Sequence, residues 1–397
     1  MMSVLYITYD GLLEPLGRSQ VIPYLLKLAQ DHRIHILSFE KPDDRGDHAA
    51  MRAMRERLAA AGVGWTPLTY HKRPTAPATA FDASVGILVA LWIALRKRVR
   101  ILHVRSYVPA LIALPVRFLT RAKLVFDMRG FWADERVDGG LWPRDGSLYR
   151  LTKSLERTFL RAADHIVTLT DASARELRGF EALQGVRKPI SVIPTCADLG
   201  KFAPPVTRPP SPFVFGYVGS VGTWYLFPQT LAFFRALLRR RPEARFLVVN
   251  RQEHALIRKL TEEAGVPRDR LELVSATHDA VAGYIQTMHL GSALIKPSYS
   301  KIASAPTKMA EYLGCGVPCL GNSGVGDVAE ILRGRNVGIV MDRLSEEDIQ
   351  DAADRALALL EDAALPSRCV ATAQELFSLE RGVAAYQDIY RSLLPAA

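Results

Sequence analysis

Cysteine is scarce in this chain, with four residues in 397: Cys196, Cys315, Cys319 and Cys369. Only Cys315 and Cys319 are close in the sequence, and no second cysteine or histidine pair completes a metal site with them. No other cluster of metal-ligating residues is visible. We therefore expect four buried thiols in a reducing compartment, and no metal in the function.

Long apolar runs are also missing. The longest, Val85–Leu95, is well short of the roughly 20 residues that a membrane-spanning helix needs. The first residues, Met1-Met2-Ser3, lead directly into a strand pattern, without the basic segment and cleavage site of a signal peptide. These two absences predict a cytoplasmic protein.

The charge is unbalanced, with a net charge of +10 and a pI of about 9.5. Such a surface suits an anionic partner, which is nucleic acid, anionic lipid or an anionic small molecule. Neither a basic helix nor an array of stacking aromatics is present, and we therefore do not expect nucleic-acid binding.

The length predicts two domains. Strand-like and helix-like segments alternate through residues 1–195, and a second alternating series fills residues 213–378. Between them, residues 196–212 are rich in proline, as in a semi-rigid linker. The fold class is therefore α/β, with two Rossmann-like, doubly wound parallel-sheet domains that face each other across a cleft. Residues 379–397 form the last predicted helix, which has the composition of a strap.

The most informative stretch runs from Lys296 to Gly316. It follows a strand-like segment, Leu290–Ile295, crosses a loop of small and polar residues, and enters a helix with Pro306 in its first turn. The first N–H groups of a helix have no internal partner and lie at the positive end of its dipole. This helix start is therefore a candidate phosphate site.

The predicted helix has two different faces. Thr307, Lys308 and Glu311 share one side, while Met309 and Leu313 share the side that would pack on a core. A cation and hydroxyl groups suit a diphosphate, and a carboxylate one turn further on suits the hydroxyls of a sugar or ribose. The alternative is that Lys308 and Glu311 form an exposed ion pair.

The first strand is also followed by a candidate ligand loop. Ser19 is expected to cap a helix, which places Gly17, Arg18, Ser19 and Gln20 at a second helix N-terminus beyond a strand end. In a doubly wound sheet, ligands often bind at this first crossover.

A third candidate loop, Asp127–Glu135, comes just after the strand Lys123–Phe126. It contains Asp127, Arg129, Trp132 and Glu135, which are suitable active-site residues at that position. A helix cap with solvated charges is the alternative, and the sequence leaves both open.

A Pro/Thr/Ala loop is expected over residues 73–79, followed by an apolar helix, Asp82–Leu95. This helix ends in a basic segment, Arg96, Lys97 and Arg98. Its middle is expected to be buried, while its basic end is a candidate contact for anionic lipid headgroups.

The stretch from Ser304 to Pro318 resembles the Ser-x-Pro-x-Lys-x-x-Glu-Tyr-x-x-x-Gly-x-Pro segment of the family 4 retaining glycosyltransferases, which have the GT-B fold. The resemblance implies that Glu311 holds the ribose of a nucleotide diphosphate sugar. It also implies that the loop before this helix holds the diphosphate and the sugar, that Gly17 approaches the phosphate or the acceptor, and that the closing helix crosses back to the first domain. The candidate donor contacts in and near that loop are Lys301, Ser304, Thr307 and Lys308. The loop after the strand Phe213–Val218 adds Gly219, Gly222 and Thr223, and the cation for the diphosphate is Lys308, Lys301 or Arg251. No metal is expected.

The chain departs from the family pattern at three places. The first glutamate of a Glu-x7-Glu motif is Ala303, and the loop Gly219–Tyr225 lacks the usual arginine and lysine. The His-Asp pair often found after the fifth strand is replaced by Asp127 and Met128. The sugar contact, the cation for the diphosphate and the activation of the acceptor therefore have to come from other residues.

The predicted function is transfer of a sugar from a nucleotide diphosphate sugar to a hydroxyl of a lipid-linked or polysaccharide acceptor, with retention of configuration. Lys308 would stabilise the leaving diphosphate, and Asp127 and Arg129 are the other candidate catalytic residues. Arg18, Ser19, Gln20, Trp132 and Glu135 are candidate acceptor contacts. A nucleotide-sugar epimerase and a non-catalytic nucleotide-sugar-binding protein are the alternatives on the same fold.

Overall fold

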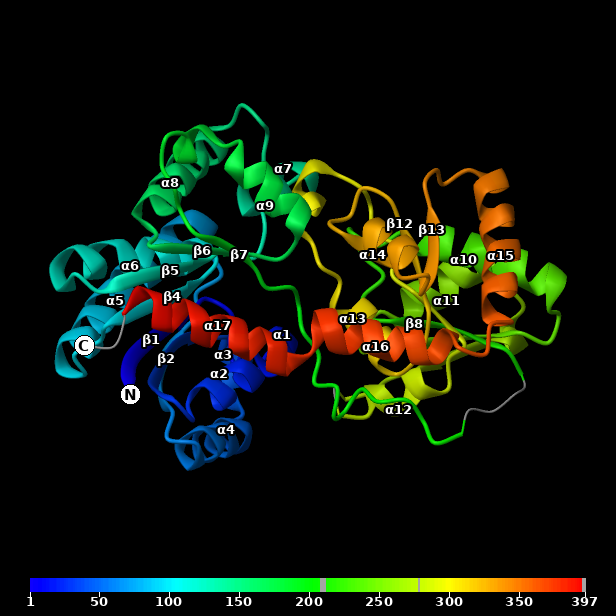
Figure 1. Ribbon diagram of the computed structural model, residues 1–397, viewed down its shortest axis with the longest axis horizontal. Coiled ribbons are helices and arrows are strands. Elements are labelled where there is room, and N and C mark those ends of the chain that lie inside the picture. Colours follow the sequence, from blue (N-terminus) through cyan, green and yellow to red (C-terminus); the bar gives the residue numbers. More distant parts are fainter. Residues whose placement is uncertain (208–211, 278, 395–397) are drawn as a thin grey trace. The chain divides into compact units, whose positions relative to one another are not determined.

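The computed structural model describes residues 1–207, 212–277 and 279–394. The chain divides into two compact units (Figure 1): one combines residues 1–193 with 379–397, and the other comprises residues 194–378. Part of the predicted linker, residues 208–211, lies outside the described residues. Each unit contains one parallel sheet covered by helices, so the α/β prediction with two doubly wound sheets is confirmed. That the domains face each other across a cleft stays a prediction.

The sheet of the first unit has seven strands in the order β3-β2-β1-β4-β5-β6-β7. The strands are β1 (Met2–Thr8), β2 (His32–Glu40), β3 (Gly64–Thr69), β4 (Ile101–Arg105), β5 (Lys123–Asp127), β6 (His165–Thr168) and β7 (Ile190–Val192). All the strand pairs are parallel. From β1 the chain proceeds to β2 on one side, while β4 lies on the other, so the order reverses between β1 and β4. Ligands of doubly wound sheets bind at such a reversal.

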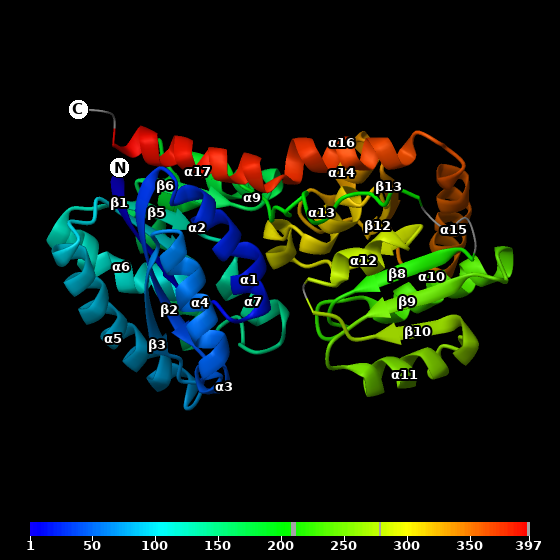
Figure 2. The same ribbon diagram turned by 90° about the horizontal axis from the view of Figure 1, so that it is seen from below.

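The helices of the first unit connect these strands. They are α1 (Pro15–Gln20), α2 (Ile22–Leu28), α3 (Pro42–Gly46), α4 (His48–Ala60), α5 (Thr75–Arg96), α6 (Tyr107–Thr120), α7 (Trp132–Asp138), α8 (Ser147–Ala162), α9 (Asp171–Arg178), the 3₁₀ turn η1 (Glu181–Leu183) and α17 (Leu379–Leu393). The last helix, α17, packs on α2, and α5 packs on α6 (Figure 2). Since β1-to-β2 and β4-to-β5 connections run in opposite directions, right-handed crossovers place α2 and α6 on opposite faces.

The apolar helix is longer than its sequence pattern predicts. It begins at Thr75, within the expected loop 73–79, and ends at Arg96. A proline in the first turn does not interrupt a helix, because the N–H groups there have no partner in any case. With 22 residues, α5 is long and apolar enough to cross a membrane by length and composition, contrary to the expectation from Val85–Leu95. Buried helices of soluble proteins pass the same test.

The second unit has a six-stranded parallel sheet in the order β10-β9-β8-β11-β12-β13. The strands are β8 (Val214–Val218), β9 (Arg245–Val249), β10 (Leu271–Val274), β11 (Leu290–Ser292), β12 (Cys319–Asn322) and β13 (Gly338–Met341). Its helices are α10 (Phe227–Arg240), α11 (His254–Glu263), η2 (Arg268–Arg270), α12 (Val281–Gln286), η3 (Tyr299–Ala303), α13 (Thr307–Gly314), α14 (Val328–Gly334), α15 (Glu346–Leu360) and α16 (Leu365–Phe377).

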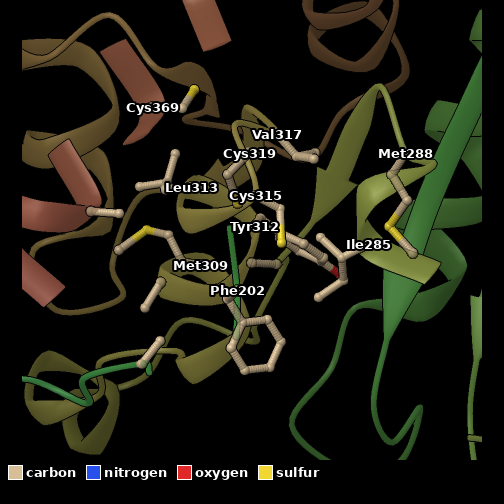
Figure 3. Close-up of a cluster of buried hydrophobic side chains, with 14 of the residues drawn as sticks. Phe202, Ile285, Met288, Met309, Tyr312, Leu313, Cys315, Val317, Cys319 and Cys369 are labelled. Atoms are coloured by element: carbon tan, nitrogen blue, oxygen red, sulfur yellow. The ribbon is translucent and has the colours of Figure 1, made fainter. Parts of the chain in front are cut away.

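The predicted core face of α13 is confirmed. Met309, Tyr312 and Leu313 are buried in one hydrophobic cluster, together with Phe202 (Figure 3). The Tyr312 hydroxyl also accepts a hydrogen bond from the N–H of Val218, at 2.9 Å, and so connects α13 to the end of β8. All four cysteines are buried thiols, as the sequence predicts.

Candidate functional site

The helix α13 begins at Thr307, directly after Pro306, and buries both of its charged residues. Lys308 is 7% exposed and Glu311 is 8% exposed, and the two side chains form no ion pair with each other. The alternative of an exposed ion pair is therefore wrong. The expectation that both residues face a ligand stays a prediction.

Lys308 is held by aromatic rings. Its Nζ atom lies 4.2 Å from the centre of the Tyr217 ring and 4.1 Å from the centre of the Tyr225 ring. Among the described residues this Nζ atom has no hydrogen-bond partner. Burial lowers the pKa of Lys308 to about 7, although the nearby Cys319 and Glu311 side chains favour its charged form. A phosphate oxygen would supply the missing acceptor, and it would favour the ammonium form.

The carboxyl group of Glu311 lies in similar surroundings. Burial raises its pKa to about 7, while Lys308 and Lys201 oppose the shift. The site therefore has one lysine and one glutamate, each near its ionisation midpoint at neutral pH. A ligand that brings negative charge to Lys308 and hydroxyl groups to Glu311 would stabilise both ionised forms.

The loop after β8 closes around Lys308. Gly219 has a φ of +109°, and a Cβ atom there would lie 3.6 Å from Lys308 Nζ. The carbonyl oxygen of Gly219 accepts a hydrogen bond of 2.9 Å from the Asn250 side chain. Glycine is needed at this position for the backbone conformation, and the loop is fixed beside the lysine by a residue that follows β9.

Glu253 fixes the rest of this loop. Its carboxylate accepts hydrogen bonds from the Ser220 hydroxyl at 2.9 Å and from the Val221 N–H at 3.0 Å. Burial favours its neutral form, but hydrogen bonds from Asn250, Val221 and Ser220 lower its pKa overall. Gly222 lies against the same carboxylate, because a Cβ atom there would be 3.4 Å from Glu253 Oε1.

A second lysine contacts Trp224, the residue before Tyr225 in the same loop. Lys301, in η3, is 6% exposed, and its Nζ atom lies 3.8 Å from the centre of the Trp224 ring. Trp224 and Tyr225 are consecutive, so the two cations contact neighbouring residues of one loop. Ser304 and Thr307 are half-buried between them in the chain. The structure thus brings the predicted Gly219 and Lys308 together, and it places Lys301 on the ring that precedes Tyr225 in the chain.

Two predicted donor residues lie at the margin of this group. Arg251 and Thr223 are exposed. Arg251 follows Asn250 at the carboxyl end of β9, and Thr223 lies in the loop that contains Trp224. Their roles in donor binding stay predictions.

We expect the charge on Lys308 to change the stability of the nucleotide-free protein with pH. Its pKa is about 7 in the folded chain and 10.5 in a solvated lysine, so between these values the unfolded chain binds the extra proton. The contribution of Lys308 to the free energy of unfolding therefore rises with pH across this interval. Between pH 7 and pH 9.5, the free energy of unfolding of the native chain should rise by about 3 kcal/mol relative to that of Lys308→Met. Urea unfolding at both pH values measures the difference, and a constant difference would mean that the ammonium is solvated.

The first unit contains a second polar group, at the carboxyl ends of β4 and β5. Asp127 is 1% exposed, and its Oδ2 atom accepts a hydrogen bond from the Tyr386 hydroxyl at 3.0 Å. The same oxygen lies 3.7 Å from Arg129 Nη1, 4.0 Å from Arg105 Nη1 and 3.9 Å from His103 Nε2. Burial favours the neutral acid, but Arg129, His103 and Arg105 together lower the pKa of Asp127 below its ordinary value. Asp127 is therefore a buried carboxylate that holds two guanidinium groups.

The backbone around this carboxylate is strained. Arg129 has a φ of +59° and Ser106 a φ of +72°, values that non-glycine residues rarely adopt. The Ser106 N–H donates a hydrogen bond of 2.8 Å to the Asp127 carbonyl oxygen. Such strain often accompanies functional sites. With a side chain that is 12% exposed, Arg129 is also the most accessible residue of the group.

The predicted helix start at Ser19 is wrong. Helix α1 begins at Pro15, and the Ser19 hydroxyl donates back to the Pro15 carbonyl oxygen at 2.8 Å. Proline at the first helical position determines the start, because it has no N–H to satisfy. Gly17 is needed for close packing within this loop, since a Cβ atom there would lie 2.2 Å from the Gly11 carbonyl oxygen. Arg18 is exposed and donates to the Leu13 carbonyl oxygen, while Gln20 is buried.

The end of the third candidate loop forms α7. Trp132, its first residue, contacts the rings of Tyr107 and Trp142 and is covered by the guanidinium group of Arg136. Glu135 is half-buried in the first turn of this helix. No side chain caps the helix, so the alternative of a helix cap is wrong. The acceptor roles of both residues stay predictions.

Sequence reasoning missed several residues of both groups. Tyr217 lies in a strand and Tyr225 in the loop after it, and aromatic residues at such positions do not by themselves indicate a lysine site. His103 and Arg105 gave a clearer signal, because they are polar residues within a short buried strand, Ile101–Arg105. Tyr386 gave none, since it lies far along the chain in an amphipathic helix.

Comparisons with known proteins concern the domain type and the fold. Residues 26–196 match the family model described as a glycosyl transferase 4-like domain. No curated protein sequence matches the chain significantly.

Three solved structures share the fold across both units. Sucrose-phosphate synthase from Thermosynechococcus elongatus has a TM-score of 0.75 at 14% identity, with all of both chains covered. HepE from Anabaena in complex with UDP-glucose has a TM-score of 0.68 at 15% identity, covering 99% of this chain and all of HepE. A putative UDP-N-acetylglucosamine 2-epimerase from Listeria monocytogenes has a TM-score of 0.63 at 12% identity, covering 98% of this chain and 96% of that chain. At these identities the similarity concerns the fold.

Proposed function

We propose that this chain, which has a GT-B fold and matches a glycosyl transferase 4-like domain over residues 26–196, is a glycosyltransferase that transfers a sugar from a nucleotide diphosphate sugar to a hydroxyl group with retention of configuration. The observation that carries the proposal is the buried Lys308 ammonium group, which has no hydrogen-bond partner among the described residues and lies one residue into a helix. HepE was solved with UDP-glucose, so a uridine nucleotide is the first donor to test.

In this proposal the lysines act on the leaving group. Departure of a nucleoside diphosphate leaves positive charge at the anomeric carbon and negative charge on the phosphate oxygens. Lys308 and the first N–H groups of α13 stabilise that negative charge, and Lys301 adds a second cation nearby. The rings of Trp224, Tyr217 and Tyr225 position these two lysines. The lysines in turn replace the arginine and lysine that members of family 4 carry in this loop. Glu311 holds the ribose hydroxyls.

The acceptor is proposed to be a lipid-linked or polysaccharide hydroxyl, and the reaction is proposed to occur in the cytoplasm or at the inner face of the cell membrane. Arg129 is the candidate acceptor or phosphate contact of the first unit, and Asp127 holds it in position. A buried carboxylate that already binds Tyr386 and two guanidinium groups is poorly suited to act as a nucleophile. The arrangement therefore favours attack by the acceptor hydroxyl on the same face of the sugar ring from which the diphosphate departs.

An epimerase is the second candidate, because a putative epimerase shares this fold. The two functions differ in what happens to the donor alone. An epimerase converts the sugar of the donor without an acceptor, whereas a transferase releases the nucleoside diphosphate, and does so faster when an acceptor is present.

The test combines binding and turnover. A thermal-shift screen of nucleoside diphosphates and their sugars should raise the melting temperature for the correct base, and Glu311→Ala should abolish that shift while the fold persists. Release of the nucleoside diphosphate from the bound donor is then measured with and without polyprenyl-phosphate-linked sugars as acceptors. Conversion of the donor to its epimer, with no diphosphate released, would contradict the proposal.

A further inference from the structure

The helix α5 exposes a stripe of large apolar side chains. Phe81, Leu88, Trp92 and Leu95 are 57%, 70%, 58% and 61% exposed. Their spacing of seven, four and three residues places them on one side of the helix, while Ala90 and others on the opposite side are buried against the unit. The outward side is therefore apolar without contributing to the core.

A second apolar group lies at the end of α6. Phe118 and Leu119 are 84% and 60% exposed. Helices α5 and α6 pack side by side (Figures 1 and 2), and both run from the carboxyl edge of the sheet to its amino edge, because each precedes a parallel strand. Their last turns therefore lie at the same edge. The Lys123 N–H donates to the Arg100 carbonyl oxygen at 2.9 Å, which joins the two chain segments that follow these helices.

Cations surround this apolar group. Five exposed basic residues lie at the ends of the two helices or just after them and form no ion pair within the described part of the chain: Arg96, Lys97, Arg98, Arg100 and Arg121. By contrast, Arg117 and Lys123 are paired with Asp164. Residues 83–126 contain no aspartate or glutamate at all. This edge of the first unit is therefore both apolar and strongly positive.

We propose that these residues form a docking surface for a bilayer that contains anionic lipid. The α5–α6 surface consists of Leu88, Trp92, Leu95, Phe118 and Leu119 with the five unpaired cations. Apolar side chains and tryptophan enter the boundary between headgroups and acyl chains, while the arginine and lysine side chains bind the phosphates above them. The helix lies in the interface without crossing it, because its other side is buried. The proposal is independent of the transferase activity.

Co-sedimentation of the full chain with vesicles tests the charge. The native chain should bind vesicles of phosphatidylcholine with 30% phosphatidylglycerol and should not bind phosphatidylcholine alone. Changing Arg98, Arg100 and Arg121 to serine should weaken binding about a hundredfold, at roughly fivefold for each of the three charges near the surface. Changing Arg52, Arg57 and Arg150 to serine removes the same charge from exposed positions on other helices and should have little effect. Equal losses in the two variants would overturn the proposal.

Site-specific labelling tests the insertion. Since the native cysteines are buried, a single cysteine at position 118, in Phe118→Cys, accepts an environment-sensitive dye selectively. Its emission should shift to the blue with anionic vesicles, whereas a label in Leu151→Cys, an exposed position on α8, should not change. An unchanged label in Phe118→Cys would overturn the proposal. So would a native dimer that Phe118→Ser and Trp92→Ser dissociate without any vesicle binding, because the occupant would then be a second copy of the chain.

Discussion

Lys308→Ala should lower the turnover number by two to three orders of magnitude. The substitution removes the ammonium group proposed to stabilise the leaving diphosphate, and the loss of one such contact typically costs a factor of about 10² to 10³. The surrounding rings of Tyr217 and Tyr225 would remain, so the change is confined to charge and hydrogen bonding. Release of the nucleoside diphosphate under saturating donor and acceptor measures the effect.

Two further variants make this result specific. Lys296→Ala removes an exposed lysine from the same segment of chain and should leave turnover unchanged. Lys308→Arg keeps the charge but places a larger, planar group between the rings, and it should recover only part of the activity. Full activity in Lys308→Ala would remove this lysine from the site and leave the transferase reaction without a cation at the helix start.

Asp127→Asn should destabilise the first unit by about 3 kcal/mol, the low end for a broken buried pair, because it removes the counter-ion of Arg129 while Arg105 keeps its ion pair with Asp10. The Tyr386 hydroxyl would keep a hydrogen-bond acceptor, so the loss is one of charge. Urea unfolding monitored by hydrogen exchange of β4 and β5 separates the first unit from the second.

This experiment also distinguishes a structural role for Asp127 from a chemical one. Tyr386→Phe removes a single hydrogen bond to the same oxygen and should cost about 1 kcal/mol. Asp145→Asn, at an exposed position, should cost nothing measurable. If Asp127→Asn abolished turnover while unfolding at the same urea concentration as the native chain, a direct chemical role for Asp127 would be supported instead.

The sequence predicted what depends on local pattern. Alternating strands and helices indicated two parallel sheets, and the 3.6-residue period of α13 identified Met309 and Leu313 as core residues. It did not predict the burial of Lys308, because the rings that cover the lysine come from Tyr217 and Tyr225, more than 80 residues away in the chain. For the same reason the contact of Asp127 with Arg105 was not predicted, since Arg105 comes from β4, whereas Arg129 belongs to the same predicted loop.

Helix starts were predicted less well where two signals competed. Ser19 has the side chain of a typical N-cap, but Pro15 precedes it and α1 already includes Ser19. At α5, a proline-containing segment was assigned to a loop, although prolines in a first turn are compatible with a helix. In both cases one local preference overrode another, and the tertiary structure decided between them.

The hydrogen bond between Tyr312 and Val218 has a mechanical consequence. It ties the helix that carries Lys308 to the strand that leads into the Gly219 loop, so the cation and the ring-bearing loop must shift together or break a buried contact. Lys308 is therefore preassembled with the loop that covers it, and a ligand that binds beside it does not have to bring the two together.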